Sequence, residues 1–155
     1  MNELARQVGE ALKARGLKLV SAESCTGGWV AMALTAVAGS SNWFERGYVT
    51  YSNAAKREDL GVAAETLARH GAVSEQVARE MAAGALEKGG ARVALAITGV
   101  AGPTGGTPAK PVGTVCFAWT DGSKMVSETR RFDGDRERVR RQSVERSLQG
   151  LLELL

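Results

Sequence analysis

The segment that most constrains the fold is Ser24-Cys25-Thr26-Gly27-Gly28, which lies between a short apolar run at residues 17–22 and an alanine-rich run at residues 26–37. The first run predicts a strand, and the second predicts a mostly buried helix that ends at Gly39. A strand-to-helix turn of this kind makes Ser24 accessible, and its glycines let a substrate approach the backbone. We expect the free N–H groups at the start of the helix to stabilise an oxyanion or to bind phosphate. The turn therefore predicts a site for a nucleophile.

The remaining segments alternate between helical and extended patterns. Helices are expected at residues 2–15, 53–60, 65–69 and 74–88, and a last one from Asp133 or Asp135 to the chain end. Strands are expected at residues 47–51 and 92–98, followed by a hairpin of residues 113–119 and 124–132. This order predicts one α/β domain over residues 1–155, with three α/β/α layers and a mixed central sheet.

Composition narrows the class of protein. Of the 155 residues 44% are apolar, and no apolar stretch approaches the roughly 20 residues that cross a bilayer. We expect a cytoplasmic protein without a membrane partner. Cys25 and Cys116 form no C-x-x-C pair, and His70 is the single histidine, so the ligands of a structural zinc are missing. No metal and no organic cofactor are expected.

Positive charge is concentrated near the end of the chain. The net charge is +3, and residues 130–146 alone hold seven arginines against four acidic residues. A broad nucleic-acid surface would spread its basic residues over a face with interleaved aromatics, but aromatics are only 5% here. We therefore expect a local anion site and no nucleic-acid partner.

The turn offers two nucleophiles, Ser24 and Cys25. A thiol is intrinsically more reactive than a hydroxyl, but neighbouring side chains on a turn point differently, and we interpret Cys25 as a small buried packing residue. A serine needs a base. His70 precedes a glycine and has the pattern of a helix C-terminus, which favours a structural role over a Ser-His arrangement. A Ser-Lys pair is the natural replacement.

Lys56 is the candidate base. It follows two alanines near an expected helix start, a context that can bury the amine and lower its pKa, although most lysines are solvated surface residues. Tyr51 ends a strand, where its phenol is either a half-buried strand residue or a hydroxyl delivered to the mouth of a site. The residues alone leave both alternatives open.

Two further segments suit an anion. The glycine-rich loop at residues 98–106 follows a buried strand, and its N–H groups can form a concavity for a phosphate, although an ordinary turn-rich connection is equally compatible with the pattern. Arg141 precedes Val144 by three residues and Leu148 by seven, so we expect it to face the core and to bind phosphate. Arg136, Arg138 and Arg140 are expected on the solvated face, although Arg140 is the near alternative to Arg141.

Five motifs occur together in one order over essentially the whole chain: SAESCTGGWVA (21–31), GSSNWFERGYVTYSNAAK (39–56), HGAVSEQVA (70–78), ITGVAGPTGG (97–106) with KPVGTVCFAW (110–119), and DRERVRRQ (135–142). Together they resemble the CinA C-terminal domain family, whose stand-alone members are nicotinamide-nucleotide amidohydrolases. The chain has Ala54 where the family often has glutamate, but the candidate catalytic residues are intact.

The resemblance implies that Ser24 is the nucleophile, that Lys56 is its general base, and that Tyr51 belongs to the same hydrogen-bonded group. It also implies that Thr98, Gly99 and Gly102 contact the substrate, with Arg141 and Gln142 from the late Arg-Arg-Gln segment. We expect the N–H groups around Cys25, Thr26 and Gly27 to hold the developing oxyanion.

The expected reaction converts nicotinamide mononucleotide to nicotinic acid mononucleotide and ammonia, and the resemblance further implies a homodimer. Two alternatives stay open at this point. One is a nucleotide-binding regulatory module in which Ser24 only forms hydrogen bonds to a ligand, and the other is an amidase for another small amide.

Overall fold

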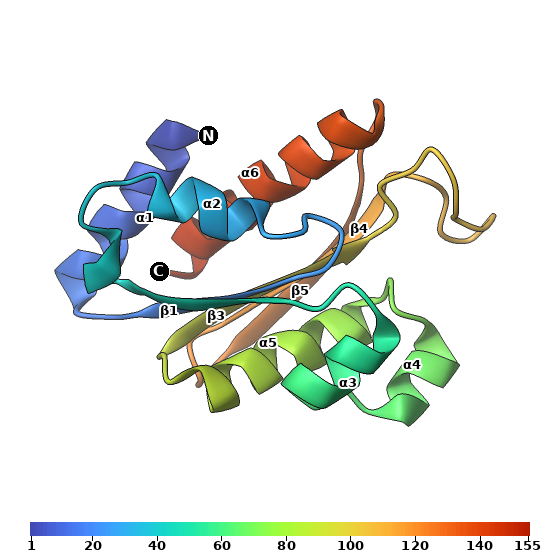
Figure 1. Cartoon of the computed structure of the whole chain (residues 1–155), viewed down its shortest axis with the longest axis horizontal. Coiled ribbons are helices and arrows are strands. Elements are labelled where there is room, and N and C mark those ends of the chain that lie inside the picture. Colours follow the sequence, from blue (N-terminus) through green and yellow to red (C-terminus); the bar gives the residue numbers. More distant parts are fainter.

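The computed structural model describes all 155 residues as a five-stranded sheet between two layers of helices (Figure 1). The strand order is β2-β1-β3-β4-β5. The strands are β1 (Leu19–Glu23), β2 (Phe44–Val49), β3 (Val93–Gly99), β4 (Thr114–Thr120) and β5 (Met125–Arg131). β1 is parallel to β2 and β3, whereas β4 is antiparallel to β3 and β5. The predicted three-layer fold with a mixed sheet is confirmed.

The helices cover both faces of the sheet. Figure 1 shows α1 (Asn2–Arg15), α2 (Trp29–Thr35) and α6 (Arg136–Leu154) on one face, and α3 (Asn53–Leu60), α4 (Ala64–His70) and α5 (Glu75–Gly89) on the other. A short 3₁₀ helix, Ser40–Asn42, leads into β2. None of these helices combines the length and the apolar character needed to cross a membrane.

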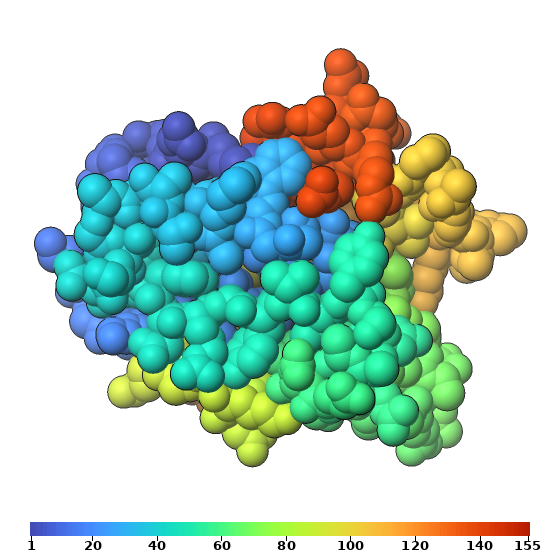
Figure 2. All heavy atoms as spheres, viewed as in Figure 1, coloured from blue at the N-terminus to red at the C-terminus, as the bar shows by residue number.

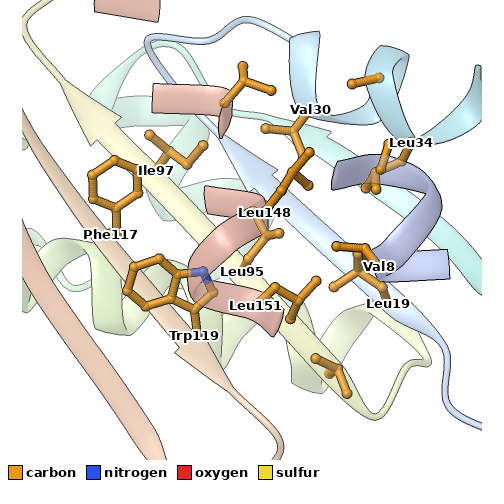
Figure 3. Packing of buried hydrophobic residues seen from close by; sticks show 14 of the residues in the cluster. Val8, Leu19, Val30, Leu34, Leu95, Ile97, Phe117, Trp119, Leu148 and Leu151 are labelled. Atoms are coloured by element: carbon orange, nitrogen blue, oxygen red, sulfur yellow. The ribbon is translucent and has the colours of Figure 1, made fainter. Parts of the chain in front are cut away.

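Two hydrophobic clusters explain why the central strands are apolar without alternation. Leu19, Leu95 and Ile97 pack under α1, α2 and α6, together with the aromatic side chains of β4 (Figure 3). Val20 and Ala96, on the opposite face, pack against α3 and α5. A strand buried on both sides gains free energy from apolar residues at every position.

The topology opens a crevice at one edge of the sheet. The chain leaves β1 toward α2 on one face, but it leaves β2 toward α3 on the other face (Figure 1). Diverging connections of this kind leave a cleft at the carboxyl ends of neighbouring parallel strands, where ligands of α/β proteins bind. The segments after β1, β2 and β3 all start at this edge.

The structure differs from the sequence expectation around the Ser24 turn. β1 continues to Glu23, and α2 starts only at Trp29, three residues later than predicted. The reason is that Gly27 and Gly28 adopt left-handed φ angles of 58° and 103°, which extend the turn and which residues with a Cβ rarely adopt. The predicted bounds of α1 and α3 are confirmed.

Candidate active site

Ser24 and Lys56 meet at the carboxyl edge of the sheet. The Lys56 Nζ atom lies 2.9 Å from the Ser24 Oγ atom and donates a second hydrogen bond, of 2.8 Å, to the Thr50 carbonyl oxygen. Lys56 is 1% exposed and Ser24 is 8% exposed. A lysine amine in this position can take the proton of the serine hydroxyl once the amine is neutral.

Local structure explains how Lys56 reaches Ser24. Ser52 caps α3 by accepting a hydrogen bond from the Ala55 N–H group, so Lys56 lies in the first turn of the helix. The side chain then points back under the end of β2. Desolvation by the surrounding protein lowers the pKa of Lys56, since a charged ammonium loses its hydration there.

A pocket of about 300 Å³ opens above this pair. It is lined by the Ser24 turn, the start of α3, the loop after β3 and the start of α6. Figure 2 shows the red start of α6, the golden loop that follows β3 and the green segment after β2 meeting on this side of the molecule. Ala72 and Val73, between α4 and α5, also line the pocket, so five segments far apart in sequence meet above the Ser24–Lys56 pair.

Tyr51 lines the pocket, as predicted for a hydroxyl at the mouth of a site. Its expected membership of the Ser24–Lys56 hydrogen-bonded group is wrong. The side chain is 62% exposed, and its hydroxyl oxygen accepts a 3.0 Å hydrogen bond from Arg136. The physical reason is that Thr50 supplies the second partner of Lys56 through its backbone, while Tyr51 has already turned outward past the end of the strand.

Cys25, the alternative nucleophile, and His70, the alternative base, both lie where they have a structural role. Cys25 is buried in the hydrophobic cluster beneath α2 and α6, and burial raises the pKa of its thiol to about 12, which confirms the expected packing role. His70 ends α4 before Gly71 and lines a different pocket from that of Ser24. No three His, Cys, Asp or Glu side chains gather in a manner that would hold a metal ion.

Glu23 is the residue that the sequence reasoning missed. It is fully buried, and its carboxylate accepts hydrogen bonds from the Thr26 hydroxyl at 2.7 Å and from the N–H groups of Gly28, Val30 and Ala31 at 3.2, 2.8 and 3.1 Å. The expectation that the helix start has free N–H groups is therefore wrong. The signal was an acidic residue at the end of a mostly apolar strand, followed six residues later by a helix start that needs an acceptor.

The N–H groups nearer to Ser24 divide into two kinds. The Gly27 N–H group donates to the Ser24 carbonyl oxygen at 3.0 Å, so it is not available to a substrate. The N–H groups of Cys25 and Thr26 have no acceptor within the protein. Of the three groups expected to hold an oxyanion, these two remain free to do so.

The loop after β3 lines the same pocket. Thr98, Gly99 and Gly102 all border it, and the Thr98 hydroxyl donates to the Ala72 carbonyl oxygen at 2.9 Å. A Cβ atom at Gly99 would lie only 3.2 Å from the Cys25 sulfur, so glycine permits the close approach of this loop to the Ser24 turn. Within residues 98–106 of this loop, five N–H groups have no acceptor within the protein: those of Ala101, Gly102, Thr104, Gly105 and Gly106.

The expected orientation of Arg141 is wrong. Its side chain is 50% exposed, lies 3.8 Å from Glu137, and places its guanidinium over the Trp29 ring. The reason is that Ser143, Ser147 and Gly150 are also buried. With these residues included, the middle of the buried face of α6 lies farther around the helix from Arg141.

Arg136 and Arg140 precede Val144 at intervals of four residues, about one helical turn each, so they lie beside the buried face of α6 without being part of it. Arg136 donates to the Gly102 carbonyl oxygen at 2.8 Å and lines the pocket. Arg140 donates to the carbonyl oxygens of Cys25 and Thr26 at 3.1 Å each. The predicted solvated position of Arg136 is confirmed, because its side chain is exposed, but its contacts were not predicted, and Arg140 is only partly exposed.

Gln142 lies outside the pocket lining. Its side-chain amide donates to the carbonyl oxygens of Asp133 and Arg138, at 2.9 and 3.0 Å. Gln142 thus holds the chain that enters α6, and a contact between Gln142 and a substrate stays a prediction.

Comparison with known proteins assigns the fold to a family. The model of the CinA C-terminal domain matches residues 1–155. This chain belongs to the CinA C-terminal domain family. It is 57% identical to the nicotinamide-nucleotide amidohydrolase PncC of Pseudomonas putida, over 97% of this chain and 94% of that protein. It is also 57% identical to the protein of the same name from Escherichia coli K12, over 96% and 91% of the two chains.

Solved structures agree with this assignment. A CinA superfamily protein from Klebsiella pneumoniae superposes with a TM-score of 0.95 at 47% identity, covering 98% of this chain and 95% of that one. The competence/damage inducible protein of Agrobacterium tumefaciens gives a TM-score of 0.96 at 46% identity, covering 99% and 94%. The CinA-family fold therefore extends over the whole of the present chain.

Proposed function

We propose that this CinA-family domain is an amidohydrolase that converts nicotinamide mononucleotide to nicotinic acid mononucleotide and ammonia. The observation that carries the proposal is the 2.9 Å approach of the buried Lys56 amine to the Ser24 hydroxyl, beneath a pocket that Arg136 and a glycine-rich loop border. The names of the 57% identical relatives support the substrate. A cytoplasmic location and a homodimer remain predictions.

The proposed mechanism uses Lys56 as base and then as acid. Neutral Lys56 takes the hydroxyl proton while Ser24 Oγ bonds to the carboxamide carbon, and the N–H groups of Cys25 and Thr26 stabilise the oxyanion. The C–N bond breaks as the amine returns the proton, and ammonia leaves an ester on Ser24. Lys56 then takes a proton from water as the water oxygen bonds to the ester carbon. The ester C–O bond breaks as Lys56 returns this proton to the Ser24 oxygen, and the released carboxylic acid loses its own proton to solvent.

We propose Arg136 as the main partner of the substrate phosphate, in place of Arg141. Its guanidinium lies at the pocket mouth between Tyr51 and Gly102, beside the loop whose N–H groups have no acceptor within the protein. A guanidinium and backbone N–H groups are the donors that phosphate oxygens favour. The exposed Arg141, whose guanidinium lies over the Trp29 ring, does not line the pocket, so we propose no phosphate contact for it.

Ammonia release from nicotinamide mononucleotide, nicotinamide riboside and free nicotinamide tests the proposal. The mononucleotide is expected to have the highest kcat/KM, because only it carries the phosphate. A binding module would instead show a rise in Tm with the mononucleotide and no ammonia. An amidase for another substrate would show faster turnover of a compound without the nucleotide.

A further inference from the structure

The turn that carries Ser24 is held by two charged side chains, neither of which points its charge into the pocket. Glu23 accepts the four hydrogen bonds that run from the turn and from the start of α2. Arg140 donates to the two carbonyl oxygens inside the same turn. One side chain thus satisfies donors of the turn, and the other satisfies its acceptors.

The contacts of Arg140 fix the direction of one N–H group. In a trans peptide the C=O and N–H bonds point in opposite directions. Because the Cys25 carbonyl oxygen faces Arg140, the Thr26 N–H group of the same peptide points away from Arg140. That group has no acceptor within the protein, so it is available to an oxyanion.

Glu23 also reaches Lys56 through the backbone. The Glu23 carbonyl oxygen accepts a 2.8 Å hydrogen bond from the Thr50 N–H group, and the Thr50 carbonyl oxygen accepts the bond from Lys56. The end of β1 and the base are therefore connected through one residue, Thr50. A shift of the Glu23 backbone would change the position of Ser24 relative to Lys56.

We propose that Glu23 and Arg140 are positioning residues, which align the Ser24 hydroxyl and the Thr26 N–H group for attack on a carbonyl or phosphoryl centre. This inference rests on the proposed serine chemistry. It assigns Arg140 to the turn and not to the substrate phosphate. The Glu23 carboxylate accepts four hydrogen bonds within the protein, and the Arg140 guanidinium donates two of its five N–H groups to carbonyl oxygens of the turn and is not among the residues that line the pocket.

The test uses a fluorophosphonate probe, which reports on Ser24 without the nucleotide substrate. The Ser24 oxygen bonds to phosphorus, fluoride leaves, and the hydroxyl proton passes to Lys56. Labelling of the folded protein gives two separate quantities: the rate per site, and the final fraction of sites labelled. A misaligned turn lowers the rate, whereas a loss of folded protein lowers the final fraction.

The variants are Glu23→Gln and Arg140→Lys. Glutamine keeps one carbonyl oxygen but places an amide NH₂ group where a carboxylate oxygen accepted from an N–H group. Lysine keeps the charge of Arg140 but loses the forked geometry. Both variants are expected to lower the labelling rate about tenfold or more with an unchanged final fraction, since losing a single oxyanion donor outright costs roughly 10²–10³.

Glu128→Gln and Arg146→Lys are the matched controls. Arg146 lies on the same helix as Arg140, is largely buried, stacks over Trp119 and pairs with Glu128, but this pair lies outside the pocket lining. These variants are expected to lower Tm without changing the rate per site. Wild-type rates in Glu23→Gln and Arg140→Lys, or equal losses of rate in the controls, would overturn the positioning role.

The failure of the proposed function has a different signature. If Ser24 of the wild type is not labelled at all, the serine chemistry is contradicted and the positioning role falls with it. If the wild type is labelled but releases no ammonia from the mononucleotide, the substrate is wrong, and the comparison of labelling rates still decides the roles of Glu23 and Arg140.

Discussion

The Lys56 amine lies 2.9 Å from the Ser24 hydroxyl, although 32 positions separate the two residues in the chain. The parallel pairing of β1 with β2 produces this approach, because it places the ends of both strands at one edge of the sheet. Burial then makes the amine a usable base, since it disfavours the charged form. Each prediction below depends on this pair or on the pocket above it.

The rate of hydrolysis is expected to rise with pH as Lys56 loses its proton. Burial lowers the pKa of Lys56, so the rising limb of kcat/KM lies below the ordinary lysine pKa of about 10.4. Measuring kcat/KM between pH 5 and pH 10 checks this. A rate independent of pH over that range would contradict a lysine base.

Lys56 is also expected to make stability depend on pH. Between its lowered folded pKa and its unfolded pKa, the unfolded chain binds the additional proton, so the free energy of unfolding rises as pH rises through this window. Tm of the wild type should therefore increase relative to Tm of Lys56→Met as pH increases. A difference in Tm between the wild type and Lys56→Met that stays the same at every pH would contradict a lowered pKa of Lys56.

Arg136→Ala is expected to raise KM for nicotinamide mononucleotide about tenfold to a hundredfold, because charge-assisted hydrogen bonds contribute roughly 1.5–3 kcal/mol each. The turnover of nicotinamide riboside, which lacks the phosphate, should change much less. Arg138→Ala removes an exposed arginine of the same helix that contacts neither Tyr51 nor Gly102, and it should leave KM unchanged. An equal rise of KM in both variants would contradict the phosphate assignment.

Iodoacetamide is expected to leave the native enzyme active at pH 8. Burial raises the pKa of Cys25 to about 12 and also raises that of Cys116, so almost no thiolate is present. Mass spectrometry should find both cysteines alkylated only after unfolding. Rapid inactivation together with labelling of Cys25 would instead support a cysteine nucleophile.

Gly28→Ala is expected to lower the free energy of unfolding by about 1–2 kcal/mol and to lower kcat as well. The left-handed φ of 103° at Gly28 is unfavourable for alanine, and relaxation of this strain moves the Ser24 turn. Gly16→Ala is the matched control, because Gly16 is also left-handed, at 63°, and lies at the end of α1. Its stability should fall by a similar amount while its kcat stays at the wild-type value.

The fold could be predicted from the sequence because local patterns specify its helices and strands. Apolar runs of strand length, glycine-terminated helices and the hairpin of residues 113–119 and 124–132 are short-range signals, and they match the observed elements closely. The pairing of Ser24 with Lys56 came from motif resemblance together with the lack of a second histidine. The structure adds the distance and the burial that the motifs do not contain.

The arginines of α6 could not be placed from the same patterns. The spacing of Val144 and the leucines predicts one buried face, but the observed buried face also includes serines whose hydroxyls donate to backbone carbonyl oxygens within the helix. Glu23 was not predicted as a buried residue because burying a carboxylate is energetically unfavourable without hydrogen-bond donors, and its four donors are seen only in the structure. The partners of Arg136 and Arg140 lie in other segments of the chain, and such partners cannot be inferred from a local pattern.

Ammonia release from nicotinamide mononucleotide by Ser24→Ala and Lys56→Met, compared with the wild type, tests the central claim most directly. Both variants should fold, bind the nucleotide with a rise in Tm, and lose at least about 10²–10⁴-fold in kcat, the range that general-base catalysis contributes. Retention of the wild-type kcat by either folded variant would contradict a Ser24 nucleophile activated by Lys56.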